Sequence, residues 1–178
     1  MSPRPALPLR LNPALNIQLC AHAIACFPEE CCGILIEDPQ GVLRFEPWKN
    51  LQNLMHAREP ERYPRDARTA YFIDPLALDQ RVAAMPSTGE RLAGIVHSHP
   101  GYPAYFSRTD RAAAAPFGFP TFDDTWQLVI SVYAEGVRDM KVFVWDEEQE
   151  RFVEGMIEEL PILLGPLAES TALEEPEP

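Results

Sequence analysis

Two histidines, a serine and an aspartate are closely spaced in the segment HSHPGYPAYFSRTD, residues 97–110. The residues that lead into it, RLAGIVHSH at 91–99, have the apolar composition of a buried strand. Side chains alternate between the two faces of a strand, so His97 and His99 are predicted to lie on the same face. Two imidazole rings on one face can bind a first-row metal ion, which makes metal chemistry the first hypothesis for this segment.

A carboxylate follows the histidines at a distance that a short loop can close. Pro100 ends the strand, and Ser107 stands where the helix SRTDRAAAA is predicted to begin, with Asp110 in its first turn. A loop that folds this turn back over the strand end completes a His, His, Asp ligand set and leaves a fourth tetrahedral position for water, as in catalytic zinc sites. Two plainer interpretations stay open: Ser107 and Asp110 form a helix-capping pair, and the histidines are hydrogen-bonded core residues.

The elements that must position these residues can be predicted along the chain. Helices are predicted over residues 13–27, 74–85 and 107–115. Strands are predicted over residues 31–37, 42–48, 71–73 and 91–99, and over three further stretches between 126 and 160, with turns at 135–138 and 146–150. Helices that interleave with strands, followed by a terminal meander, indicate an α/β domain with a mixed central sheet covered on both faces.

Residues 50–68 are polar, are interrupted by Pro60 and Pro64, and are predicted to form a loop. The segment carries four arginines that alternate with acidic residues, namely Arg58, Arg62, Arg65 and Arg68. The favoured interpretation is a solvated loop of mixed charge, and the alternative is a specific anion-binding site.

Composition restricts the remaining function classes. The 178 residues carry a formal net charge of −12, which disfavours nucleic acid as a partner because its phosphates would be repelled. No apolar run approaches the ~18 residues of a membrane span, and the start lacks the apolar core of a secretion signal, so a cytoplasmic protein without membrane contact is expected. The four cysteines crowd into residues 20–32 and are expected to be free thiols. One domain is expected over residues 1–160, followed by an acidic, proline-containing tail at 161–178 that is expected to be disordered.

The spacing His-x-His, seven residues, Ser-x-x-Asp resembles the JAMM motif of the MPN+ metalloproteases. Members of that family also place a glutamate at the junction of the first helix and first strand, in a segment similar to P-x-E-x-C-G. Here PEECCGIL, which begins at Pro28, supplies the segment, and its matching glutamate is Glu30. The resemblance extends over about residues 12–146 and includes YFIDP at 71–75, a common feature of the bacterial members.

The resemblance implies a role for each matching residue. His97, His99 and Asp110 would bind one zinc ion per chain, and zinc lowers the pKa of bound water to about 7. Glu30 would take a proton from that water and deliver it to the leaving amine, while Ser107 would donate a hydrogen bond to the oxyanion. From its position alone Glu30 would be a plain surface carboxylate, and only the joint match makes it catalytic. No substrate-binding residue is implied.

For fold and activity, the resemblance implies an MPN (JAB-like) domain with cytidine-deaminase-like layering and a zinc-dependent peptidase or isopeptidase. Compact members cut after the C-terminal Gly-Gly tail of ubiquitin-like proteins, including sulfur carriers, so such a carrier or a peptide is the expected partner. A homodimer is a further possibility. The alternatives are a non-catalytic MPN scaffold that binds partners, and a domain in which the metal serves stability.

The loop between the histidines and the motif serine departs from the family pattern. Members often have proline directly before that serine, where this chain has Phe106. The loop is also aromatic, and Tyr102, Tyr105 and Phe106 are expected to pack on the domain, the alternative being a wall of a substrate channel. Thiolate ligation by Cys31 and Cys32 is disfavoured, since Cys32 already matches the family pattern as a strand residue. Neither the H-E-x-x-H signature of thermolysin-like proteases nor the P-C-x-x-C signature of nucleobase deaminases is present.

Overall fold

The computed structural model describes residues 8–158, which form two sheets, four α-helices and one 3₁₀ turn. The elements in chain order are β1 Leu9–Arg10, α1 Pro13–Cys26, β2 Cys32–Glu37, β3 Leu43–Trp48, α2 Gln52–Arg58, α3 Pro75–Ala84, η2 Met85–Thr88, β4 Arg91–Pro100, α4 Arg108–Ala114, β5 Trp126–Tyr133, β6 Gly136–Asp146, β7 Arg151–Glu154 and β8 Ile157–Glu158. The expected tail at 161–178 lies outside the described residues.

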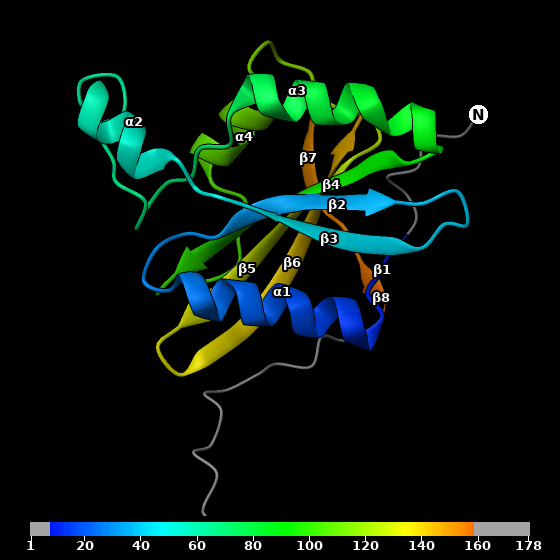
Figure 1. Cartoon of the computed structure of the whole chain (residues 1–178), viewed down its shortest axis with the longest axis horizontal. Coiled ribbons are helices and arrows are strands. Elements are labelled where there is room, and N and C mark those ends of the chain that lie inside the picture. Colours follow the sequence, from blue (N-terminus) through cyan, green and yellow to red (C-terminus); the bar gives the residue numbers. More distant parts are fainter. Residues whose placement is uncertain (1–7, 159–178) are drawn as a thin grey trace, which may run out of the picture.

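The main sheet has six strands in the order β3-β2-β4-β5-β6-β7 (Figure 1). Strands β4 and β5 run parallel, and every other neighbouring pair in this sheet is antiparallel, so the predicted mixed sheet is confirmed. Strand β4 lies inside the sheet, where its register places His97 opposite Cys32 of β2 and Val129 of β5. A strand with neighbours on both sides holds its side chains in fixed directions, which suits a site that depends on alignment.

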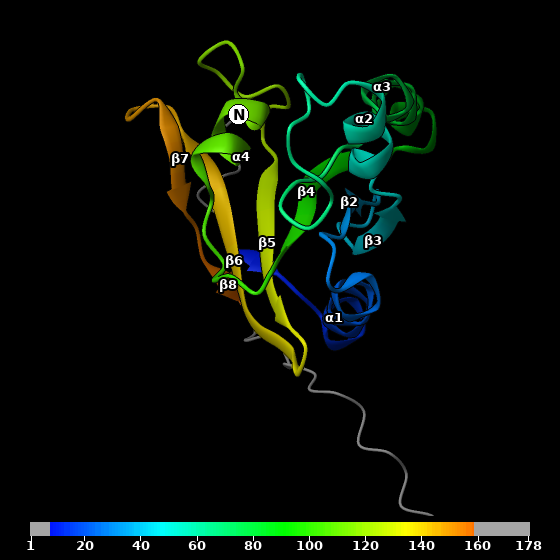
Figure 2. The ribbon, with the colours of Figure 1, turned by 90° about the vertical axis from the view of Figure 1, so that its left-hand side faces the viewer.

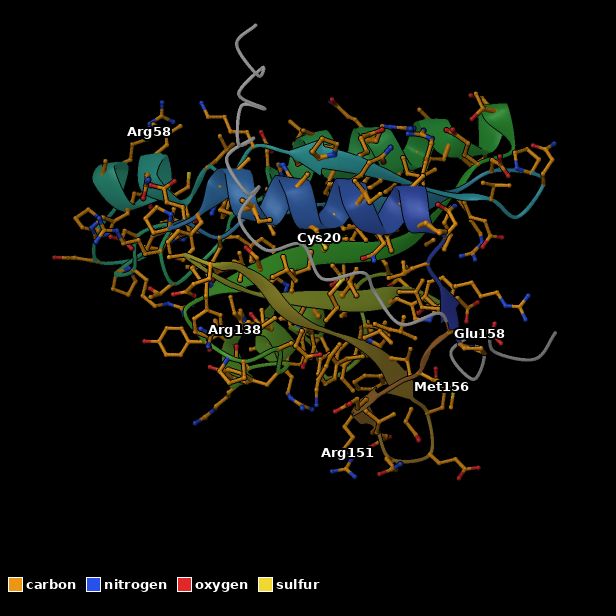
Figure 3. The ribbon with its side chains drawn as sticks, turned by 90° about the horizontal axis from the view of Figure 1, so that it is seen from below. Cys20, Arg58, Arg138, Arg151, Met156 and Glu158 are labelled. Atoms are coloured by element: carbon orange, nitrogen blue, oxygen red, sulfur yellow. The ribbon has the colours of Figure 1, made fainter. Side chains whose placement is uncertain are left out.

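Helices cover both faces of this sheet, as the sequence predicts. Helix α1 lies along one face and α3 along the other (Figures 1 and 2), and α1 crosses in front of the strands when the molecule is seen from below (Figure 3). On the α1 side, Leu15 and Leu19 pack in one apolar core with Leu128 of β5. On the α3 side, Leu78 packs in a second core with Ile95 of β4. A third cluster, which includes Phe106 and Val129, is packed against residues at the end of α4.

The helices on the two faces begin where their capping residues predict. The Asn12 side chain accepts a hydrogen bond from the Leu15 amide at 2.8 Å, and Pro13 occupies the first turn of α1. The Asp74 side chain does the same for the Leu76 amide at 2.9 Å at the start of α3. Since these caps are local, they could be recognised from sequence alone.

Gly33 allows β2 to pack closely against its neighbour β3. A Cβ atom at this position would lie 2.5 Å from a ring carbon of Phe45 and 2.6 Å from the Glu46 carbonyl oxygen. Such contacts are far inside van der Waals distance, so only glycine fits here. Gly33 directly follows Cys32, and Cys32 pairs with His97 of β4. The close packing of β2 on β3 is therefore next to the strand that carries the two histidines.

The expectation of a loop over residues 50–68 is wrong in its first part. Residues Gln52–Arg58 form α2, which lacks a side-chain cap at its first turn. The helix is held by tertiary hydrogen bonds. Asn53 Oδ1 accepts from the Ala67 amide at 2.8 Å, and Gln52 Nε2 donates to the Arg65 carbonyl at 2.7 Å. These partners lie 13 and 14 residues away, so local pattern could not reveal them.

Two strand predictions are also corrected. Residues 71–73 are not a strand and belong to no sheet. The Phe72 carbonyl instead accepts a hydrogen bond from the Leu51 amide at 2.9 Å. The last predicted strand is split at Gly155, where β7 ends its pairing with β6, and β8 pairs in parallel with β1. Among residues 8–158, no helix is both long and apolar enough to cross a membrane.

Candidate metal centre

Three side chains meet where the end of β4 faces the first turn of α4. The Nε2 atoms of His97 and His99 lie 3.2 Å apart, and the Asp110 Oδ2 atom lies 3.6 Å from the first and 3.5 Å from the second. Ligands bound at about 2.0–2.1 Å to a tetrahedral ion stand about 3.3 Å apart, so these separations fit such an ion closely. All three residues are buried, and the group they form could hold a metal ion.

A neighbouring carbonyl determines which ring nitrogen of His99 carries a proton. His99 Nδ1 lies 3.1 Å from the Pro103 carbonyl oxygen, which can only accept a hydrogen bond. Nδ1 therefore carries the proton, and Nε2 directs its lone pair at the other two ligand atoms. This arrangement, a ligand ring whose second nitrogen donates to a carbonyl, is the usual one for metal-binding histidine.

His97 is held in a different way. Its ring stacks on the Tyr71 ring with centroids 4.7 Å apart and planes 20° apart. Its Nδ1 atom is buried and has no hydrogen-bond partner within residues 8–158. Stacking on Tyr71 therefore fixes the plane of the His97 ring, whereas a hydrogen bond to the Pro103 carbonyl fixes that of His99.

Asp110 caps its own helix and also faces the histidines. Its Oδ2 atom accepts from the Ser107 amide at 2.8 Å, and the Ser107 Oγ atom accepts from the Asp110 amide at 3.1 Å, which is a complete capping box. The capping interpretation is therefore confirmed, and it coexists with the ligand geometry because Oδ2 takes part in both. The Ser107 hydroxyl uses only an oxygen lone pair in the cap, so its own O–H can still donate.

The charges of the group are set by burial and by the closeness of its members. Burial opposes ionisation of Asp110, but the two imidazoles outweigh it and hold its pKa well below the ordinary value. Burial lowers the pKa of His97, so this ring is neutral near pH 7. Burial also tends to lower the pKa of His99, but hydrogen bonds with Asp110 and the Pro103 carbonyl outweigh it, so the pKa of His99 is raised. The group thus offers one carboxylate and imidazole nitrogens, a donor set that suits zinc.

Glu30 is brought to this centre by the strand pair β2–β4. The Cys31 amide donates to Ser98 Oγ at 2.8 Å, and the Ser98 amide donates to the Cys31 carbonyl at 3.1 Å. Ser98 points away from the two histidines, so it fastens the residue after Glu30 to the strand that carries them. The Glu30 carbonyl also accepts from Asn50 Nδ2 at 3.0 Å. The backbone around the Glu30 side chain is fixed from both sides.

Glu30 is 7% exposed and lies outside the group of three candidate ligands. Burial raises its pKa to about 8, the charge of His99 lowers it and that of Asp110 raises it. The pKa of such a carboxyl group lies near neutrality, which suits a residue that accepts and returns a proton. A divalent cation beside it would favour the ionised form.

A cavity of about 500 Å³ opens beside the ligand group. Asp110 forms part of its wall, and the rest is mainly apolar, with Tyr71, Ile73, Leu78 and Phe122 among its residues. It continues to the segment that follows α2, where Arg65 is part of the wall. Of the five residues of the JAMM-like pattern, Asp110 is the one in this wall, so the cavity adjoins the centre at that carboxylate.

The aromatic residues of the loop before Ser107 differ in their burial. Phe106 is 4% exposed and stacks on Phe143 at 5.3 Å, so the packing expectation is confirmed for this residue. Tyr102 is 55% exposed, and for it the expectation is wrong. Tyr105 is 48% exposed but places its ring 4.9 Å from that of His99. Phe106 therefore takes up the position before the motif serine as a core residue, and α4 keeps its place.

Sequence reasoning missed the residues that support the site. Asn50 donates to the Glu30 and Ala70 carbonyls and accepts from the amides of Gln52 and Phe72. An asparagine after a strand has no periodic signal, so only its burial among backbone groups identifies it. Tyr71 could have been found from YFIDP, but its stacking on a histidine 26 positions later has no sequence signal.

The cysteines match the expectation of free thiols. All four are free, and three of them are buried. Burial raises the pKa of Cys32 to about 12, so this thiol stays protonated near pH 7. Its Sγ atom instead lies 3.6 Å from the Trp48 carbonyl oxygen. Cys32 thus acts as a strand residue, as its place in the motif implies.

A mixed sheet covered by helices, with a buried His, His, Asp group at the end of an inner strand, defines an α/β domain with a candidate metal centre. The model of the family described as prokaryotic homologs of the JAB domain matches residues 13–146, and the chain belongs to this family. That match contains all five residues of the JAMM-like pattern.

Solved structures share this fold. The solution structure of DSY2949 from Desulfitobacterium hafniense is 24% identical, with a TM-score of 0.58 over 84% of this chain and 90% of that one. The solution structure of a Salinibacter ruber protein is 21% identical, with a TM-score of 0.52 over 88% of this chain and 96% of that one. The search of curated proteins gave no match.

Proposed function

We propose that this protein is a zinc-dependent metallopeptidase that hydrolyses the amide bond after the Gly-Gly tail of a ubiquitin-like or sulfur-carrier protein. The observation that carries the proposal is the 3.2–3.6 Å spacing of the candidate ligand atoms of His97, His99 and Asp110. Glu30 is buried and close enough for the charges of His99 and Asp110 to act on its pKa. Membership of the JAB-domain family supports the same reading.

The chain supplies the proton transfers that hydrolysis needs. Zinc in this site would act as a Lewis acid and bring the pKa of a water molecule near 7. Glu30 accepts a proton from the attacking water and returns it to the leaving nitrogen. The Ser107 hydroxyl donates to the carbonyl oxygen as negative charge grows on it. One water is consumed, the C–N bond breaks, and the products are a carboxylate and an amine.

Burial of the centre favours a slender acyl segment. His99 and Glu30 are each only 7% exposed, so a scissile bond flanked by bulky side chains would meet the walls before reaching them. Two glycines present no side chain and can lie extended against a narrow entrance. This physical argument agrees with the Gly-Gly tail that the family resemblance implies.

A non-catalytic scaffold is the alternative function, and the site argues against it. A scaffold needs neither a buried carboxyl with a pKa raised to about 8 nor ligand atoms aligned by dedicated contacts. Burial of such groups costs stability because they lose their hydration, so a domain that keeps them is expected to use them. Their convergence therefore favours an enzyme.

The test is hydrolysis by the zinc-loaded protein of a carrier whose Gly-Gly tail is extended, with products read by mass spectrometry. Glu30→Gln keeps the shape of the side chain but cannot transfer the proton, so turnover should fall by about 10²–10⁴-fold while zinc content is unchanged. Equal turnover in this variant, or no product from the wild-type protein, would contradict the proposal.

A further inference from the structure

Tyr71 lies between the metal centre and the cavity beside it. Its ring stacks on the His97 ring with centroids 4.7 Å apart and planes 20° apart, and it forms part of the cavity wall together with Asp110. Burial raises the pKa of Tyr71, and the charges of Asp110 and Glu30 raise it further, so the phenol is near both carboxyl groups. Tyr71 is therefore close to the reacting groups, although it is outside the five-residue pattern.

The hydroxyl group of Tyr71 makes no hydrogen bond with residues 8–158. Its oxygen is not among the sealed buried atoms of this part of the chain, and the accessible space beside Tyr71 is the cavity. A buried tyrosine hydroxyl usually finds a partner, because loss of hydration without a new hydrogen bond costs stability. A phenol keeps its proton near pH 7 even at its ordinary pKa of about 10. The cavity therefore contains a hydrogen-bond donor that the protein does not use.

Packing alone does not account for this hydroxyl. Tyr71 packs with its ring against the apolar core on the α3 side, and its stacking on His97 also uses only the ring. A phenylalanine would make both contacts without carrying an unpaired polar group. The hydroxyl is thus the one part of this side chain that the fold does not need.

Asn50 fixes the backbone on both sides of Tyr71. Its Nδ2 atom donates to the Ala70 carbonyl at 3.1 Å, and its Oδ1 atom accepts from the Phe72 amide at 3.0 Å. The same Nδ2 atom donates to the Glu30 carbonyl at 3.0 Å, so one side chain holds both Tyr71 and Glu30 in place. A donor that is fixed before a ligand arrives loses little conformational entropy when the ligand binds.

A backbone carbonyl is the substrate group that matches this donor. Carbonyl oxygens are the acceptors that any extended peptide presents, whatever its side chains. In the proposed reaction the Ser107 hydroxyl donates to the reacting carbonyl. The acceptor for Tyr71 is then the carbonyl of a neighbouring residue, on the cavity side of the reacting bond.

We propose, on the basis of the function proposed above, that the Tyr71 hydroxyl donates a hydrogen bond to a backbone carbonyl oxygen of the substrate, in the residue next to the reacting bond. The contact recognises the peptide backbone and not a side chain. Tyr71 thus positions a candidate metal ligand with its ring and the substrate with its hydroxyl. Because this hydrogen bond forms when the substrate binds and does not change in the reaction, it acts on KM and not on kcat.

The experiment is Tyr71→Phe, which removes only the hydroxyl. In cleavage of the carrier with an extended Gly-Gly tail, the zinc-loaded variant should show a KM about tenfold higher and a kcat changed by less than about twofold. Its zinc affinity should equal that of the wild-type protein, because the stacked ring is kept. Tyr71→Leu also removes the ring and should lower zinc affinity by about tenfold, since His97 loses the contact that fixes its plane. Tyr133→Phe is the matched control, because Tyr133 is outside the cavity wall and packs under Arg138.

Three results would overturn the contact. They are an unchanged KM in Tyr71→Phe, a fall in kcat alone, which would place the hydroxyl at the reacting group, and a loss of zinc, which would show that it acts through His97. Calorimetry separates this inference from the proposed function. The carrier should bind zinc-loaded Glu30→Gln about tenfold more tightly than the same protein with Tyr71→Phe added, and equal affinities would also overturn the contact. Absence of cleavage by the wild-type protein contradicts the proposed function alone.

Discussion

Asp110 uses one carboxylate oxygen both to start a helix and to face two imidazoles. Oδ2 accepts from the Ser107 amide at 2.8 Å and lies 3.5 Å from His99 Nε2. The cap therefore fixes the rotamer that presents the carboxylate to the centre, so no separate residue is needed to orient it. This sharing explains why Ser107 and Asp110 stand three positions apart, the spacing that a capping box requires.

Removing this carboxylate should lower metal affinity far more than it lowers stability. Loss of an outer-shell partner commonly costs 10–100-fold in affinity, so Asp110→Ala, which removes a direct ligand, should cost at least about 100-fold. Loss of the cap should cost only about 1 kcal/mol in the free energy of unfolding. Metal content after dialysis against a weak chelator measures the first quantity, and urea denaturation the second.

Asp79→Ala is the matched control for this prediction. Asp79 lines the same cavity but is not one of the three ligand residues. Its removal should leave zinc content unchanged. Equal retention of zinc by Asp110→Ala and the wild-type protein would remove Asp110 from the ligand set.

At the scale of elements, the sequence predicts the parts whose signals are local. The helices α1 and α3 could be predicted because Asn12 and Asp74 cap them, and the inward face of β4 because alternation assigns His97 and His99 to one side. Helix α2 could not be predicted, since it has only seven residues, its residue Leu51 provides no side-chain cap, and its partners Arg65 and Ala67 are distant in sequence. The same holds for residues 71–73, whose backbone bonds run to Leu51 and Asn50 rather than to a strand.

Asn50 joins these segments, and its replacement should affect both stability and turnover. Asn50→Ala leaves four backbone groups without their partner, among them the Glu30 and Ala70 carbonyls, and should lower the free energy of unfolding by about 2–3 kcal/mol. Displacement of Glu30 should also reduce turnover by roughly 10–100-fold, because catalysis depends on near-ångström placement. Urea denaturation and steady-state kinetics at saturating zinc measure the two effects.

Asn12→Ala separates these two effects. Asn12 caps α1 on the opposite face of the sheet, so its loss should cost about 1 kcal/mol of stability without slowing turnover. A turnover defect of equal size in both variants would show that general destabilisation, rather than the position of Glu30, is responsible.

Ion pairs connect Arg81 of α3 to Glu46 of the edge strand β3, and they predict how stability depends on pH. Burial would raise the pKa of Glu46, but hydrogen bonds from Arg81 and Trp48 outweigh it, so the pKa lies below 4.5. A depressed pKa means that the carboxylate contributes stability above about pH 4.5 and loses that contribution as pH falls through the folded-state value. Glu46→Gln should therefore lower the free energy of unfolding by about 0.5–1 kcal/mol at pH 7 and by much less near pH 2.5.

Urea denaturation at the two pH values checks this prediction. The control is Glu135→Gln, since Glu135 pairs with Arg138 at 3.1 Å but its side chain is 70% exposed. Exposed pairs contribute little, so this variant should match the wild-type protein at both pH values. A loss in Glu46→Gln that is as large at pH 2.5 as at pH 7 would show that its cause is not the charge.

For the whole molecule, the position of the site follows from the topology of the sheet. His97 and His99 lie near the C-terminal end of β4, which forms the parallel pair with β5. Crevices at the C-terminal ends of parallel strands are the usual ligand sites of α/β sheets. The large apolar core beneath α1 lies on the opposite face and contains none of the ligand residues. The motif could predict the candidate ligands, but the cavity and the two arginines in its wall, Arg62 and Arg65, depend on tertiary contacts that only the fold displays.

This separation of core and site predicts that the domain remains folded without metal. Removal of zinc with a chelator should leave the far-ultraviolet circular dichroism unchanged, because both apolar cores that flank the sheet are complete without the site. Zinc at 100 times its dissociation constant should add about 2.7 kcal/mol of stability, which corresponds to a rise in Tm of about 5–11 °C for a chain of this size. His97→Ala, which loses a ligand, should show no such rise. Loss of secondary structure on chelation would instead assign the metal a structural role, and the centre would then have to be regarded as a folding site rather than a catalytic one.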